Sequence, residues 1–77
     1  MANWIKVSKQ LRKEFTFKNF SEAMAFINRV ANLAEEQKHY PDIMLYHGKH
    51  VRLSLTTHSE GKVTEADYNL AELIDGV

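Results

Sequence analysis

Four histidines, His39, His47, His50 and His58, give this chain of 77 residues its clearest potential for chemistry. Imidazole has an ordinary pKa of about 6.5, so it can donate or accept a proton close to neutral pH. It is also the commonest metal ligand among side chains. Acid–base catalysis and metal binding are therefore the two kinds of chemistry to compare.

The spacing of the histidines disfavours a metal site. His50 and His58 have the same parity on a predicted strand but are eight residues apart, which is about 26 Å along an extended chain. His47 and His50 flank a predicted turn at Gly48, where solvated side chains are expected. The chain has no cysteine and no close pair of histidines on a helix, so we expect neither zinc nor iron.

Each acid–base candidate also has a local explanation when taken singly. A histidine in the last turn of a helix, as predicted for His39, interacts favourably with the helix dipole. His58 can be a polar residue at a strand end, and Glu35 can be a solvated acid. Asp67 occupies the third position of a predicted helix, where capping and the dipole explain an acidic residue.

The period of the apolar side chains predicts the first elements that position these residues. Leu11, Phe15 and Phe17 alternate with polar residues, which indicates a half-buried strand preceded by a short partner strand over residues 4–7. A helical period follows from Ser21 to Lys38, and Asn19 or Ser21 is the expected cap.

The second half of the chain repeats the pattern of two strands and a helix. Residues 43–46 and 50–57 are predicted strands joined by a turn at Gly48. Thr64 and Asp67 have the spacing of a helix cap and predict a final helix. The simplest arrangement of this β-β-α-β-β-α order is an α+β domain over residues 1–77, a single antiparallel four-stranded sheet with both helices packed on one face.

The apolar residues of the 21–38 helix cover about half its circumference, which is more than one sheet requires. They are Ala23, Met24, Phe26, Ile27, Val30, Ala31, Leu33 and Ala34. A small core without disulfides also benefits from a partner. We therefore expect a homo-oligomer that uses this helix, although small exposed apolar residues are also ordinary.

Several residues match a known motif. They are Glu35, His39, Pro41, Tyr46, Thr57, His58 and Asp67. In this pattern the chain resembles the pterin-4a-carbinolamine dehydratases, in which a helix ends in Glu-x-x-x-His-His-Pro, a later strand ends in Thr-His, and an Asp lies near the start of the last helix. The resemblance extends from Trp4 onward, and Tyr40 replaces the usual second histidine.

The resemblance implies a dehydratase that acts on 4a-hydroxytetrahydropterin, a pterin oxidised by aromatic amino acid hydroxylases, and releases quinonoid dihydropterin. It favours His39 and His58 as the acid–base pair, with their individual roles open, because the departing hydroxide needs a proton and the neighbouring ring nitrogen must lose one. Glu35 is expected to orient His39 from one helical turn earlier. No metal or organic cofactor is required.

The same resemblance implies further contacts and an alternative function. Tyr40 is expected to hydrogen-bond or pack against the pterin ring, with Pro41 and Thr57 also in the substrate site. Family members form homo-dimers and homo-tetramers. Some are dimerisation cofactors of a homeodomain transcription factor, and carboxysomal relatives resemble Rubisco assembly factors, so a protein-binding module is the alternative. Retention of His39, Pro41 and His58 favours the enzyme.

Composition excludes other classes of partner. Ten Lys and Arg residues balance ten Asp and Glu residues, and no basic run is present, so direct nucleic-acid binding is disfavoured. The longest apolar stretch is well short of the roughly 20 residues that span a bilayer, and the first residues do not resemble a signal peptide. We expect a soluble, cytoplasmic protein without membrane association.

Overall fold

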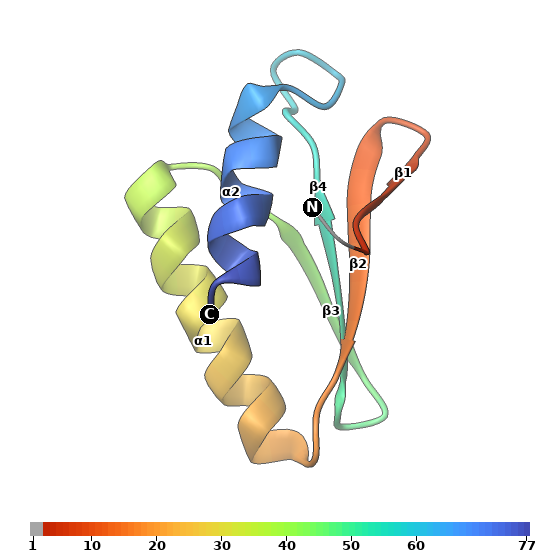
Figure 1. The fold of residues 1–77 in the computed structure, drawn as a ribbon, viewed down its shortest axis with the longest axis vertical. Helices are drawn as coiled ribbons and strands as arrows, with labels where there is room; N and C mark the ends of the chain where they lie inside the picture. Colours follow the sequence, from red (N-terminus) through yellow and green to blue (C-terminus); the bar gives the residue numbers. More distant parts are fainter. Residues whose placement is uncertain (1–2) are drawn as a thin grey trace.

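The structure of the protein is a computed structural model, which describes residues 3–77, and its elements follow the predicted order. They are β1 (Ile5–Val7), β2 (Gln10–Thr16), α1 (Phe20–Gln37), β3 (Asp42–Tyr46), β4 (His50–Leu55) and α2 (Glu65–Asp75). Both helices lie on the same side of one sheet (Figure 1). The α+β prediction is confirmed, with element boundaries that differ by one or two residues.

The four strands form an antiparallel sheet in the order β1-β2-β4-β3. In the β2–β4 pair, Leu11 is opposite Leu55 and Phe15 is opposite Val51. Directly opposite residues share a face, so these apolar side chains all point toward the helices. The face away from the helices carries polar pairs such as Glu14 and Arg52.

The core lies between the sheet and the two helices. Its fully buried side chains include Val51, Leu53 and Leu55 of β4, which alternate with half-buried polar residues as a one-sided strand requires. From α1 the core receives Ala23, Phe26, Val30 and Ala34, and from α2 it receives Leu70, Ala71 and Ile74. This helical spacing of three and four residues aligns each buried stripe with the sheet.

The start and end of α1 are determined by local hydrogen bonds. Asn19 is the N-cap, and its side-chain oxygen accepts the Glu22 amide hydrogen bond at 2.9 Å. At the other end Lys38 adopts a left-handed conformation with φ of 53°, and the His39 amide donates to the Ala34 carbonyl at 3.1 Å. This Schellman-type ending turns the chain sharply, so His39 lies just beyond the helix.

Candidate active site

The carboxylate of Asp67 is the only charged side chain among residues 3–77 that is buried completely. Its Oδ1 lies 2.5 Å from Nε2 of His39, and its Oδ2 accepts hydrogen bonds of 2.8 Å from the Thr57 hydroxyl and from the Thr64 backbone amide. Burying a carboxylate is costly unless such donors replace its water. The carboxylate therefore links three segments, which are the end of α1, the loop after β4 and the start of α2.

The local explanation for Asp67 was incomplete. The Thr64 amide contact confirms that Asp67 caps α2, but the capping bond occupies Oδ2 and leaves Oδ1 to accept from His39. A cap needs only one of the two carboxylate oxygens, so a capping motif does not exclude a second role. Sequence reasoning left Asp67 out of the candidate site, although the acid near the last helix belonged to the motif that the chain resembles.

One ring nitrogen of His39 contacts the Asp67 carboxylate, while part of the ring remains accessible. Its side chain is 17% exposed, and Nε2 faces the Asp67 carboxylate. A carboxylate can only accept a hydrogen bond, so Nε2 carries the hydrogen in the neutral ring and Nδ1 is the basic nitrogen. The contact thus selects the tautomer of His39.

His58 is positioned by a tight turn between β4 and α2. Thr57 pairs with Lys62 across this turn, with the Thr57 amide donating to the Lys62 carbonyl at 3.0 Å. Gly61 has φ of +67°, a conformation that favours glycine, and its amide donates to the Thr57 carbonyl at 2.8 Å. These bonds project His58 from an ordered turn, and its side chain is exposed.

A hollow of about 180 Å³ brings most of the predicted site residues together. It is lined by Lys38, His39, Tyr40, Thr56, Thr57, His58 and Ser59. A larger hollow of about 340 Å³ adjoins it and shares Thr56 and His58 with it. Both lie at the end of the molecule that holds the end of α1, the loop after β4 and the β1–β2 turn (Figure 1).

Comparison with known proteins supports the motif across the whole chain. The family model described as pterin 4 alpha carbinolamine dehydratase matches residues 1–77. The chain belongs to the pterin-4a-carbinolamine dehydratase family. A provisionally named pterin-4-alpha-carbinolamine dehydratase of Thermomicrobium roseum is 52% identical over 71 residues, which cover 92% of this chain and 75% of the relative. Another from Sulfolobus acidocaldarius is 42% identical over 77 residues and is covered to 84%.

Two solved structures have the same fold. A transcriptional coactivator/pterin dehydratase from Brucella melitensis superposes with a TM-score of 0.90 at 34% identity, covering 97% of this chain and 81% of that one. A pterin dehydratase-like protein identified as a RuBisCO assembly factor in the alpha-carboxysome gives a TM-score of 0.81 at 26% identity, covering 96% of this chain and 87% of that one.

Glu35 and Tyr40, two residues that the sequence predicted for the substrate site, interact electrostatically with each other. The carboxylate of Glu35 raises the pKa of the Tyr40 phenol above its usual value, first through hydrogen bonding and then through charge. The sequence led us to expect Glu35 to orient His39, whereas the partner that the structure shows for the His39 ring is Asp67. Pro41 follows Tyr40, is half-buried and separates the site from β3.

Tyr46, which also belongs to the pterin carbinolamine dehydratase motif, lies outside the smaller hollow. Its hydroxyl donates to Oε1 of Glu14 at 2.7 Å, on the sheet face away from the helices. Its ring stacks on the His50 ring, with centroids 5.2 Å apart. The structure thus separates His47 and His50, near Tyr46, from His39 and His58 at the other end of the molecule.

Two further observations concern metals and membranes. Within residues 3–77, no three His, Asp, Glu or Cys side chains lie close enough together to hold a metal ion. The helices in this part of the chain are too short or too polar to cross a bilayer.

Proposed function

We propose that this protein converts 4a-hydroxytetrahydropterin to quinonoid dihydropterin, in the recycling of tetrahydrobiopterin. The observation that carries the proposal is that His39 and His58 line one hollow while a buried carboxylate holds His39. Family membership supports the substrate class. The reaction needs one group that donates a proton and one that removes a proton, and two imidazoles can do both near neutral pH.

The geometry around His39 suits the proton-accepting role. When Nδ1 takes the proton from the ring nitrogen beside carbon 4a, the ring becomes an imidazolium whose Nε2 faces the Asp67 carboxylate. A negative charge at this distance stabilises the new positive charge. His58, which is exposed, would then donate a proton to the departing hydroxide, so that water leaves. The bond electrons released at nitrogen form the new double bond to carbon 4a.

A rate measurement with freshly prepared 4a-hydroxytetrahydropterin tests this proposal. We expect the purified protein to accelerate dehydration without added metal and in the presence of a chelator. His39→Ala and His58→Ala should each lower the rate by about 10² or more, because each removes a proton-transfer group. His47→Asn is the matched control, since His47 lies in the β3–β4 turn at the other end of the molecule (Figure 1) and has φ of 52°, which Asn tolerates.

The alternative is a protein-binding module, because one structural neighbour is a transcriptional coactivator as well as a pterin dehydratase and the other is a RuBisCO assembly factor. In that case the wild type and both histidine variants would show the same slow rate of dehydration. A cytoplasmic location is also a part of the proposal and fits either function.

We further propose that the protein forms a homo-dimer or homo-tetramer through α1. After the core stripe is buried, Ala31 on this helix is exposed, Met24 is half-buried and Phe20 is 57% exposed. Replacing Met24 or Ala31 with Glu would place an unpaired charge in an apolar contact. Light scattering should then show a lower mass than for the wild type, and a wild type that is monomeric at high concentration would contradict the proposal.

A further inference from the structure

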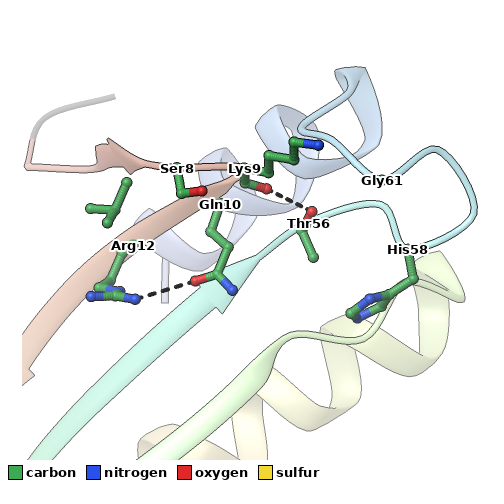
Figure 2. Close-up of a pocket in the computed structure, with 8 residues that line it drawn as sticks. Ser8, Lys9, Gln10, Arg12, Thr56, His58 and Gly61 are labelled. Carbon is green, nitrogen blue, oxygen red and sulfur yellow. Dashed lines mark hydrogen bonds between the residues drawn. The ribbon is translucent and has the colours of Figure 1, made fainter.

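The larger hollow beside the candidate active site is formed mainly by the β1–β2 hairpin. Figure 2 shows Lys9, Gln10 and Arg12 on one side and Thr56, His58 and Gly61 on the other. The Thr56 hydroxyl donates to the Lys9 carbonyl at 2.7 Å, and this bond holds the hairpin turn against the end of β4. The hollow is thus bounded by segments that are far apart in the sequence but joined by a hydrogen bond.

The charged side chains that line this hollow are all positive. Lys9 and Arg12 are among the residues that line it, and none of the lining residues is acidic. The nearest acid along β2 is Glu14, which is already engaged by Tyr46 and Arg52. Within residues 3–77, neither Lys9 nor Arg12 forms an ion pair. The charged side chains that line the hollow are therefore all basic, although the Glu14 carboxylate, two residues further along β2, lies close enough to Arg12 to interact with its charge.

Arg12 in particular is incompletely satisfied. Its Nη2 makes one long contact of 3.4 Å with the Gln10 side-chain oxygen. Its Nε is buried and has no hydrogen-bond partner among the described residues. A guanidinium has five N–H donors in a planar fork that fits phosphate and carboxylate groups. The terminal guanidinium nitrogens, for which the long Gln10 contact is the one hydrogen bond found among the described residues, could donate to a ligand with several acceptor oxygens.

We propose that this hollow binds a phosphate monoester at the end of the side chain that the pterin carries, so that the protein prefers phosphorylated pterins. The inference rests on the proposed function, and extends it to the substrate class. A pterin ring between His39 and His58 would point its substituent past His58, which lines both hollows. Phosphate is favoured over carboxylate because its double negative charge and three terminal oxygens suit the planar fork of Arg12, while the flexible side chain of Lys9 adds a second positive charge to the same hollow.

A matched pair of stable ligands tests the inference without relying on catalysis. The probes are 6-hydroxymethyl-dihydropterin and its phosphate monoester, and the measurement is an equilibrium titration monitored by pterin fluorescence. We expect the phosphate to bind about tenfold tighter or more, as charge-assisted hydrogen bonds allow. This preference should decrease as salt is added, because salt screens the accessible charges.

Variants of the lining residues then test which side chains cause the preference for the phosphate monoester. Arg12→Gln should remove most of it, Arg12→Lys should retain part of it because the charge remains, and Lys9→Gln should reduce it severalfold. Lys49→Gln is the matched control, since it also removes one positive charge but lies in the exposed β3–β4 turn at the other end of the molecule (Figure 1). If Arg12→Gln fails to fold by circular dichroism, the exposed Lys9 decides the test instead.

Two results would overturn the inference. One is equal affinity of the wild type for both ligands, and the other is an equal loss of preference in Lys49→Gln and Lys9→Gln. Dehydration assays separate this inference from the proposed function. Turnover of neutral pterins by a protein with no phosphate preference would reject only the inference, whereas phosphate preference without turnover would reject only the dehydratase.

Discussion

Two polar networks of this molecule are each centred on one carboxylate, yet they lie in opposite environments. The Asp67 side chain is completely buried beneath the smaller hollow and accepts from three donors. The Glu14 side chain lies on the open face of the sheet, where 45% of it is exposed and it accepts from Tyr46 and Arg52.

The contrast shows that burial, more than the number of hydrogen bonds, determines what a carboxylate does in this fold. Water can replace each donor around Glu14, so its contacts restrain little and are screened by salt. No water is available to replace the donors around Asp67, so losing one leaves a buried charge uncompensated. The buried network can therefore hold His39 in one orientation, while the exposed network has little effect on the site.

The largest expected difference between the two networks is in stability. Asp67→Ala should lower the free energy of unfolding by roughly 2–4 kcal/mol, because it leaves buried donors without an acceptor. Glu14→Ala, the matched change on the open face, should cost at most about 1 kcal/mol. Urea denaturation followed by circular dichroism measures both. Equal losses would show that burial does not separate the two carboxylates.

A second change keeps the shape of Asp67 and removes its charge. Asp67→Asn should lower the rate of 4a-hydroxytetrahydropterin dehydration by about 10- to 100-fold, because an amide no longer stabilises the His39 imidazolium and can favour the other tautomer. Glu14→Gln is the control and should retain the wild-type rate. An Asp67→Asn enzyme that folds and keeps the wild-type rate would restrict Asp67 to a structural role.

Tyr40 lines the smaller hollow beside His39, and it is the position where this chain departs from the family motif. Tyr40→Phe removes the hydroxyl that is proposed to hydrogen-bond the pterin, so the KM should rise by about 2- to 12-fold with little change in kcat. Since Glu35 raises the pKa of the phenol, Tyr40 stays protonated and this KM effect should persist up to about pH 10.

Tyr40→His restores the residue that the family motif has at this position and separates the two candidate functions. The variant should be at least as active as the wild type if the chain is an enzyme. A wild type that is inert and becomes active only with histidine would instead favour the protein-binding module.

The smallest expected effect concerns the Glu14 network and pH. Hydrogen bonding from Tyr46 and then Arg52 lowers the pKa of Glu14, so its stabilisation is present above the unfolded pKa of about 4.3 and is lost as pH falls through the lower folded value. Glu14→Gln should therefore reduce the melting temperature by about 1–3 °C at pH 7. The difference from the wild type should shrink progressively as the pH falls below about 4, and a difference that does not shrink would require another cause.

Local patterns in the sequence were sufficient for the elements of the fold. Alternation in β2 and β4 and the helical period of α1 depend on side chains that are close in the chain, and so do the caps at Asn19 and Thr64. These predictions are confirmed within one or two residues. The order of the elements then left few ways to bury the apolar faces, and the layered arrangement followed.

By itself, the sequence determined the elements, the motif, and the candidate histidines His39 and His58. Only the tertiary structure decided that the Asp67 carboxylate reaches His39, which lies 28 positions earlier in the chain, and that the Glu35 carboxylate instead raises the pKa of Tyr40. The physical reason is that a cap is a local hydrogen bond, whereas the burial that makes the second carboxylate oxygen matter arises only when α1, α2 and the loop after β4 pack together.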